Sequence, residues 1–203
     1  VRIATFLENF WRFPDYIVRI FHFDTGPNTG RVVFTDPADW MWGLGKWSIQ
    51  IFETVLIAYV GTIIGAVFGF LLCFLAAENL MSNGWIRNTA KRTLEFFRTV
   101  PEIVFALIFV VAFGLGPVPG VLAIALHTIG ALGKQFSEVV ENADMRPFEG
   151  VTASGATWAE AVRFAIVPQV LSNFVSYTLL RFEINVRGAS VMGFVGAGGI
   201  GQD

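Results

Sequence analysis

The sequence has one cysteine, Cys73, only two histidines, and few charged residues, which make up 15% of its 203 positions. A single cysteine excludes a framework of intrachain disulfides. No cysteine–histidine cluster has the spacing of zinc ligands, and two histidines give no basis for a Ser-His-Asp arrangement. An ordinary soluble domain carries about 25% charged residues. This chain therefore has too few charges to cover a surface that faces water.

Two nucleotide-binding signatures are also missing or unsupported. No G-x-x-x-x-G-K-[ST] run occurs, so the chain does not bind ATP by that device. Gly196–Gly201 matches G-x-G-x-x-G in form, but that fingerprint needs a βαβ unit, which the sequence does not predict. Gly198 and Gly199 are better explained as flexible backbone near a gate. The net charge of −2, without a basic stripe, argues against nucleic-acid binding.

Apolar residues are abundant where charges are rare. Hydrophobic residues make up 54% of the chain, with 21 Phe and 21 Gly. This hydrophobicity excludes a disordered chain. Phenylalanine and glycine at this level are typical of helices packed in lipid. The expected fold is therefore all-α and polytopic in a lipid bilayer.

Four membrane spans are expected from the charge-free runs, since a span needs about 20 apolar residues. The first is 54–77. The run 103–133 is too long for one span and is interrupted by glycines and prolines at 114–120, which predict a turn between two spans. The first of these two begins near Phe96 and the second near Val118.

The fourth expected span is 164–180, and the glycine-rich stretch 188–202 is expected to form a short helix or a re-entrant segment. Lysines and arginines are concentrated in 78–102 and 134–163, so the positive-inside rule places both segments in the cytoplasm. Residues 1–46 are then extracytoplasmic, and 47–203 form the membrane domain. Because the chain starts at a valine and stops after a glycine run, we expect it to lack a first and a last helix.

A small-residue face is expected on the first span. Gly61, Gly65 and Gly69 recur every fourth residue and share one side of a helix. Such a face allows a neighbouring helix to approach closely. It fits ordinary packing within the chain, which we favour, or an interface with another subunit or gate.

The cytoplasmic segment 134–163 predicts two short helices joined by a glycine turn. Pro147 suits the first position of a helix and Gly155 suits a helix end. Thr157 and Glu160 have the spacing of a capping box for a second helix, which Pro168 would kink. This rigid unit could dock into a partner or could simply be a stable connection between two spans.

The spacing of this segment resembles the cytoplasmic EAA loop of ABC importer permeases. In that family, Glu-Ala-Ala is followed by three residues, Gly, nine residues and Ile-x-Leu-Pro. Here Glu149, Gly155 and Pro168 keep the spacing, with Ala153 inside the loop. Gly150 and Val151 replace the two alanines, and Ala165 and Val167 replace the Ile and Leu. The resemblance implies that the loop docks into an ATPase subunit.

Further stretches resemble the permeases of phosphonate and phosphite importers. They are Arg98–Glu102 (RTVPE), Leu126–Lys134 (LHTIGALGK), Arg181–Arg187 (RFEINVR) and Gly193–Gly201 (GFVGAGGIG). This resemblance covers about residues 53–203. It implies a type I ABC importer permease fold that moves its substrate by alternating access.

The resemblance also implies the partners and the location of the chain. It predicts a homodimer with a second permease copy, an ABC ATPase that binds the ATP, and an extracytoplasmic phosphonate-binding protein. The chain itself would be a translocation pathway in the bacterial inner membrane, not an enzyme, and would need no cofactor of its own. Two other functions remain open. One is a methionine-type or other small-solute importer permease, and the other is an ATP-independent channel or membrane enzyme.

Ionisable residues at membrane depth are candidates for the pathway or gate, because burying them is costly. His127 could face a translocation path, although hydrogen bonding to a neighbouring carbonyl is the interpretation we favour. Glu183 and Arg187 have the spacing of a helix ion pair, which leaves Arg181 less committed. An unpaired arginine would attract an anionic substrate, but both arginines could instead hold the irregular C-terminal segment.

Overall fold

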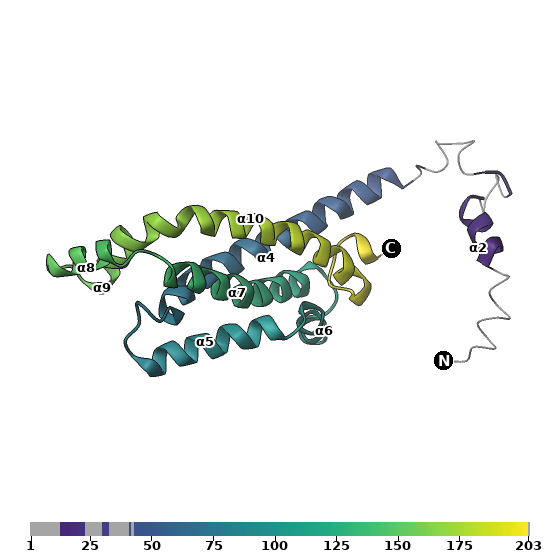
Figure 1. The fold of residues 1–203 in the computed structure, drawn as a ribbon. Coiled ribbons are helices and arrows are strands. Elements are labelled where there is room, and N and C mark those ends of the chain that lie inside the picture. Colours follow the sequence, from purple (N-terminus) through teal and green to yellow (C-terminus); the bar gives the residue numbers. More distant parts are fainter. Residues whose placement is uncertain (1–12, 23–29, 33–40, 42, 203) are drawn as a thin grey trace. The chain divides into compact units, whose positions relative to one another are not determined.

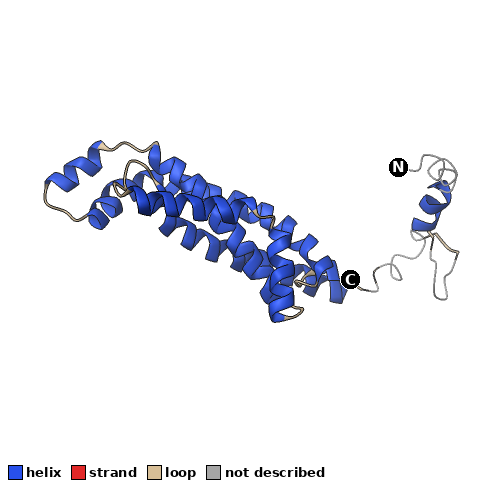
Figure 2. Ribbon diagram, turned by 90° about the horizontal axis from the view of Figure 1, so that it is seen from below, coloured by secondary structure: helices blue, strands red, loops and turns tan. Residues whose placement is uncertain are grey.

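The computed structural model describes residues 13–22, 30–32, 41 and 43–202, which divide into two compact units, 1–48 and 49–203. The described part of the first unit contains helix α2 (Phe13–Ile20) and an isolated bridge between His22 and Val32. Most of the segment expected to be extracytoplasmic lies outside the described residues. The described elements are all helical, which confirms the all-α prediction (Figure 2).

Two helices in the described residues are long and apolar enough to cross a bilayer: α4 (Leu44–Ala76) and α7 (Pro117–Glu141). They cover the first expected span up to Ala76 and the third, and both are longer than the runs that predicted them (Figure 1). Beyond Glu53, helix α4 is apolar on all sides, and the whole helix contains no proline to interrupt it. Helix α7 continues to Glu141 because its last turns pack against other helices.

The second expected span is wrong as a single helix. Helices α5 (Gly84–Thr99) and α6 (Glu102–Phe113) meet at 86°, with Pro101 between them. A proline disfavours helical backbone at the residue before it, and Val100 is extended accordingly. The two helices would count as a third span only if the bent pair crosses the bilayer together. Helix α5 lies beside α7, so Arg98 is not in a loop outside the bundle.

The turn predicted between the second and third spans is confirmed at residues 114–116. Gly114 and Gly116 have φ values of 87° and 144°, which residues other than glycine rarely adopt. The N–H of Gly116 donates to the carbonyl of Gly196, 3.0 Å away. Pro117 then begins α7, where its missing N–H costs nothing.

After α7 the chain forms what we call the elbow, residues 146–166. It consists of α8 (Arg146–Ala153), α9 (Trp158–Ala161) and the π-helical turn η2 (Val162–Ile166). The elbow leads directly into α10 (Val167–Met192), which contains most of the fourth expected span. Helix α10 carries Arg181, Glu183 and Arg187 and is too polar to join α4 and α7 as a span by composition.

The kink expected at Pro168 takes the form of the π turn η2. The N–H of Val167 donates to the carbonyl of Val162, one residue further back than in an α-helix. Pro168 has no N–H to donate, and the widened turn before it absorbs that loss without ending the helix. The helical path is therefore continuous from α9 through η2 into α10, whereas a turn at 154–157 separates α8 from it.

The expected short segment at 188–202 is partly helix α10 and partly irregular. Helix α10 ends at Met192 and is followed by the 3₁₀ turns η3 (Gly193–Val195) and η4 (Ile200–Gln202). Within the second unit, the elbow lies at one end of the bundle. Helix α6 and the segment 193–202 lie at the other, which we call the glycine end (Figure 1).

Candidate functional site

The elbow is fixed by a hydrogen bond to the loop after α4, and that loop is itself bonded to the end of α7. The indole N–H of Trp158 donates to the carbonyl of Leu80, 3.1 Å away. The side chain of Asn79 donates to the carbonyl of Val140 at 2.8 Å. These bonds join three segments that are distant in the sequence, so the elbow is held to the bundle at its base.

The side chain of Gln169 makes a second connection at the base of the elbow. Its amide oxygen accepts from the N–H of Asp144 and its amide nitrogen donates to the carbonyl of the same residue, both at 3.1 Å. Asp144 in turn accepts from the N–H of Arg146, the first residue of α8. The start of α8 is therefore positioned by the first turn of α10.

An ion pair network lies next to these contacts. The ammonium of Lys91 lies 2.8 Å from a carboxylate oxygen of Glu78 and 3.3 Å from one of Glu141. The hydrogen bond from Lys91 lowers the pKa of the Glu78 carboxyl. The network joins α5, the end of α7 and the loop after α4.

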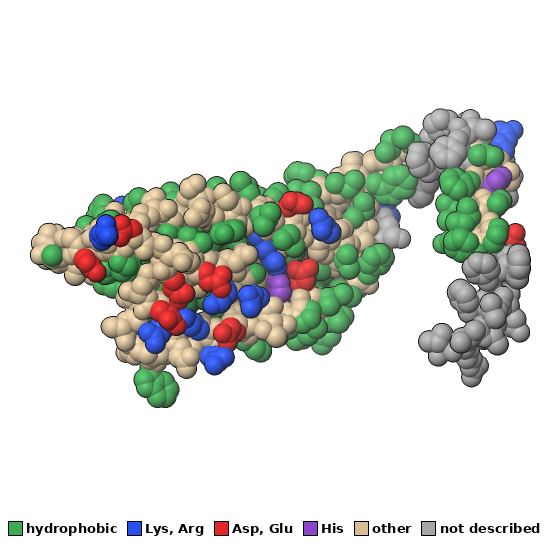
Figure 3. Space-filling model, in the orientation of Figure 1, with side chains coloured by type: hydrophobic (Ala, Val, Ile, Leu, Met, Phe, Trp, Pro, Cys, Tyr) green, Lys and Arg blue, Asp and Glu red, His purple; other side chains and the backbone are tan. Residues whose placement is uncertain are grey.

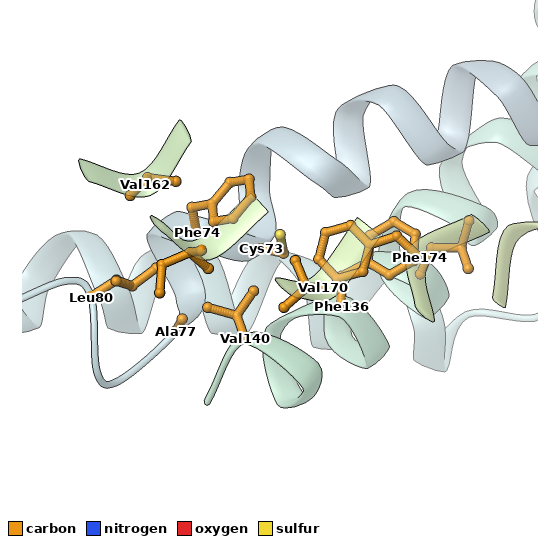
Figure 4. Close-up of a cluster of buried hydrophobic side chains, with 11 residues drawn as sticks. Cys73, Phe74, Ala77, Leu80, Phe136, Val140, Val162, Val170 and Phe174 are labelled. Atoms are coloured by element: carbon orange, nitrogen blue, oxygen red, sulfur yellow. The ribbon is translucent and has the colours of Figure 1, made fainter. Parts of the chain in front are cut away.

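A hydrophobic cluster supports the elbow from below (Figure 4). The rings of Phe136 and Phe174 stack with centroids 4.0 Å apart, joining α7 to α10. Val162 and Ile166 of the π turn are buried in the same cluster as Phe74 of α4. Movement of the elbow would therefore be passed to all three long helices.

The outer surface of the elbow is exposed. Helix α8 has no buried residue, and Glu149, Ala153 and Gly155 all face solvent. Gly155 has φ of 94°, and a side chain at this position would meet no atom within 4 Å. The glycine is therefore required by the backbone conformation and not by close packing.

The predicted capping box is confirmed at the start of α9. The carboxylate of Glu160 accepts from the N–H of Thr157 at 2.8 Å and from its hydroxyl at 2.7 Å. These hydrogen bonds lower the pKa of the Glu160 carboxyl. The capping box thus fixes the direction in which α9 leaves the turn after α8.

The small-residue face of α4 packs against α7. A Cβ atom on Gly61 would lie 2.7 Å from the side chain of Ile124, and one on Gly65 would lie 2.5 Å from that of Thr128. A Cβ on Gly69 would lie 3.1 Å from the backbone of Gly133. The three glycines therefore allow α4 and α7 of the same chain to approach closely.

A buried polar junction joins the same two helices to α10. The amide nitrogen of Asn185, which is fully buried, donates to the hydroxyls of Thr62 and Thr128 at 2.8 Å and 2.9 Å. The hydroxyl of Thr62 donates onward to the carbonyl of Ala58. Asn185 was not expected to have this role. The only sequence signal is an asparagine and two threonines at membrane depth.

A basic pocket of about 190 Å³ lies between α5, α7 and α10, and its lining includes Arg98, His127 and Arg181. A ring nitrogen of His127 lies 3.0 Å from the carbonyl of Val100 at the break between α5 and α6. Figure 3 shows basic side chains and a histidine grouped with acidic ones in the middle of this face. Sequence reasoning identified His127 and Arg181 as candidates but missed Arg98 as a member of the same pocket.

The other candidate gate residues lie apart from this pocket lining. Arg187 and Glu183 form the expected ion pair at 3.4 Å, with both side chains exposed. Gly198 and Gly199 lie at the glycine end, with φ values of 88° and 85°. There they pack closely against Pro117 and Thr54, respectively.

Comparison with known proteins identifies related sequences. Residues 69–203 match the family described as "Binding-protein-dependent transport system inner membrane component". The phosphite transport system permease protein of Stutzerimonas stutzeri is 40% identical over 159 residues, which cover 78% of this chain and 58% of that protein. The phosphate-import permease protein of Mycolicibacterium smegmatis is 42% identical over 149 residues, covering 73% of this chain and 28% of that protein. The chain thus spans between about a quarter and three fifths of these relatives.

The solved structures support the fold. The methionine ABC transporter MetNI, in inward-facing conformations, superposes with a TM-score of 0.70 at 21% sequence identity. The match covers 81% of this chain and 80% of that chain. The expected type I ABC importer permease fold is therefore confirmed.

Proposed function

The chain belongs to the family of binding-protein-dependent transport system inner membrane components, and on that premise we propose that it is the permease subunit of an ATP-driven importer of phosphorus oxyanions. Phosphonates and phosphite are the proposed substrates. The named relatives at about 40% identity carry phosphite and phosphate in their names, which supports this substrate class. A methionine-type permease is the weaker alternative, because the similarity to the methionine transporter concerns the fold alone.

The observation that carries the proposal is the elbow. Its base is bonded through Trp158 to the loop after α4, which Asn79 joins to the end of α7, and its outer face, α8, is exposed. A docked ATPase subunit would push on α8, and the hydrogen bonds at Asn79 and Trp158 would transmit that push to the bundle. This is the arrangement that alternating access requires, since a small movement at one end must change the packing of whole helices.

The proposed complex contains two copies of this permease, two ABC ATPase subunits that bind ATP, and an extracytoplasmic phosphonate-binding protein. The elbow end would face the cytoplasm and the glycine end the outside of a bacterial inner membrane. The exposed side chains of α6, such as Val111, would then face lipid or the second copy. The chain itself would supply the pathway and catalyse no reaction.

Uptake by proteoliposomes tests the proposal. The vesicles hold the complete permease with the ATPase and binding protein encoded beside it, and are offered labelled methylphosphonate. We expect uptake that requires ATP and is blocked by unlabelled phosphonate or phosphite but not by methionine. Competition by methionine would overturn the substrate class. Uptake without ATP in an assembled complex would overturn the importer mechanism.

Gly155→Val is expected to uncouple transport from ATP hydrolysis. Space is open around Gly155, so the size of the new side chain is not the cause. The positive φ is the cause, because a residue with a Cβ atom there costs roughly 1–2 kcal/mol and would re-aim α8. We expect several-fold less substrate moved per ATP hydrolysed, measured in the same proteoliposomes.

Two variants serve as controls for this prediction. Gly155→Asn should stay close to wild type, because asparagine tolerates a positive φ better than valine. Gly150→Ala places a methyl group in open space in the middle of α8 without a change of backbone, and should be coupled normally. A Gly155→Val protein with wild-type coupling would show that coupling does not depend on the orientation of α8.

A further inference from the structure

We propose that Arg98, His127 and Arg181 form an oxyanion-binding site within this subunit, where the transported anion is held before release at the elbow end. The inference rests on the proposed function and deepens it, because it assigns substrate contact to the permease itself. The three residues come from α5, α7 and α10 and line one pocket. Each lies on a different helix, so the packing of the bundle controls the spacing of the site.

The charges at the pocket do not balance without a ligand. Arg181 has its Nε atom buried, and that atom makes no hydrogen bond with any described residue. Among the described residues, Arg98 forms no ion pair. Arg181 is only half-buried and Arg98 is exposed, but the buried Nε of Arg181 is a donor without a partner, and an anion in the pocket would supply one.

One acidic residue, Glu102, lies near these basic groups. Its carboxylate packs directly against Gly188 on α10, where a larger residue would collide with it. The lining of the pocket carries two arginines and no carboxylate, so one neighbouring carboxylate leaves the pocket with an excess of positive charge. A zwitterionic amino acid would bring a second positive charge into it. The balance therefore favours a ligand with a net negative charge.

The size and donors of the pocket fit a small phosphorus oxyanion. A volume of about 190 Å³ is below the roughly 300–1,000 Å³ typical of pockets for drug-sized ligands. The planar guanidinium groups of Arg98 and Arg181 present paired N–H donors that match two oxygens of one phosphoryl group. His127 donates from Nδ1 to the carbonyl of Val100, so its Nε2 can donate to the anion only when the ring is protonated.

A polar groove connects this pocket with the elbow end. The groove, of about 540 Å³, shares Gln135 and Tyr177 with the basic pocket and extends to Asp144 and Gln169 at the base of the elbow. Glu138 and Asp144 give the groove acidic walls, which bind an anion less well than the pocket does. An anion leaving the basic pocket past Gln135 and Tyr177 would therefore be released and not trapped again.

The test compares uptake by the complete transporter carrying Arg181→Gln, Arg181→Lys or Arg98→Gln. We expect Arg181→Gln to slow ATP-dependent methylphosphonate uptake by about tenfold to a hundredfold, the effect of losing a charged hydrogen-bond donor pair. Arg181→Lys should recover part of the rate, and Arg98→Gln should lose less than Arg181→Gln. Wild-type uptake by both glutamine variants would overturn the proposal.

The matched control is Arg92→Gln. Arg92 lies on α5 like Arg98, is exposed, and pairs with Glu95 at 2.7 Å. It should transport like the wild type, so that equal losses at Arg92 and Arg98 would argue against a specific site. Each variant is checked for co-purification with the ATPase. If Arg181→Gln does not assemble, Arg98→Gln and Arg181→Lys carry the test, because each should raise the substrate concentration needed for half-maximal uptake.

A double variant separates substrate binding from a structural role of Arg181. If Arg181 only neutralises Glu102, then Glu102→Gln combined with Arg181→Gln will restore transport, and the proposal fails. If Arg181 contacts the anion, the double variant will stay as slow as Arg181→Gln. Failure of the proposed function is recognised separately, because the wild-type transporter would then show no ATP-dependent uptake of phosphonate.

Discussion

Replacing Gly130 with alanine is expected to lower the free energy of unfolding by about 3 kcal/mol, near the upper end for overpacked cores. A Cβ atom at this position in α7 would lie 2.7 Å from the carbonyl oxygen of Leu94 and 2.8 Å from the carbonyl carbon of Phe97. It would also collide with the backbone nitrogen of Arg98. All three atoms belong to the backbone of α5, so no side chain can rotate away. The two helices must separate.

Unfolding of the purified protein in mixed micelles measures this loss. Gly84→Ala is the control, because it adds the same methyl group at the start of α5, where nothing lies within 4 Å. It should unfold like the wild type or slightly later, since alanine favours helix over glycine. Gly130→Ala should also slow transport, because the backbone it displaces carries Arg98. Equal stability of the two variants would contradict the close contact between α5 and α7.

The second large effect is expected for Asn185→Ala. This substitution removes both hydrogen bonds that join α10 to Thr62 of α4 and Thr128 of α7. Interhelical hydrogen bonds in membrane proteins are worth about 0.6 kcal/mol on average and up to about 1.7, so two of them predict a loss of about 1–3 kcal/mol. A small cavity at this fully buried position adds to the loss.

The same unfolding assay measures this effect, with Asn173→Ala as control. Asn173 lies on α10 but is exposed, so its truncation should change stability by less than about 0.5 kcal/mol. Combining Asn185→Ala with Thr62→Val completes a double-mutant cycle. The loss of stability in the double variant should be smaller than the sum of the two single losses, because both substitutions break the same bond. Full additivity would show that Asn185 and Thr62 act independently.

Run length and composition were sufficient to predict α4, α7 and the turn between 114 and 116. A charge-free stretch predicts a span without any knowledge of its neighbours, and glycines with prolines predict a turn locally. The capping box at Thr157 was predictable for the same reason, since its hydrogen bonds lie within three residues. What depends on local sequence could be foreseen.

The break at Pro101 shows where this reasoning stops. The sequence allows a single helix from Phe96 to Leu115 with charges in its first turns, and it equally allows two helices. The packing of α5 against Gly130 and Gly133 decides between them, and that contact is distant in the sequence. The basic pocket depends on this choice, because Arg98 lines the same pocket as Arg181 only when α5 lies along α7. His127 and Arg181 could be suspected singly, but their grouping could not.

The continuity of α9 and η2 with α10 makes this helix a lever arm. At a rise of 1.5 Å per residue, the 26 residues of α10 extend about 39 Å from its first residue to its last. A tilt of about 5° about the elbow would then displace the far tip by about 3 Å over that length. Gly193 and Gly196 follow that tip, and Arg181 lies a little beyond its midpoint. The same stroke therefore moves the glycine end nearly twice as far as it moves the arginine.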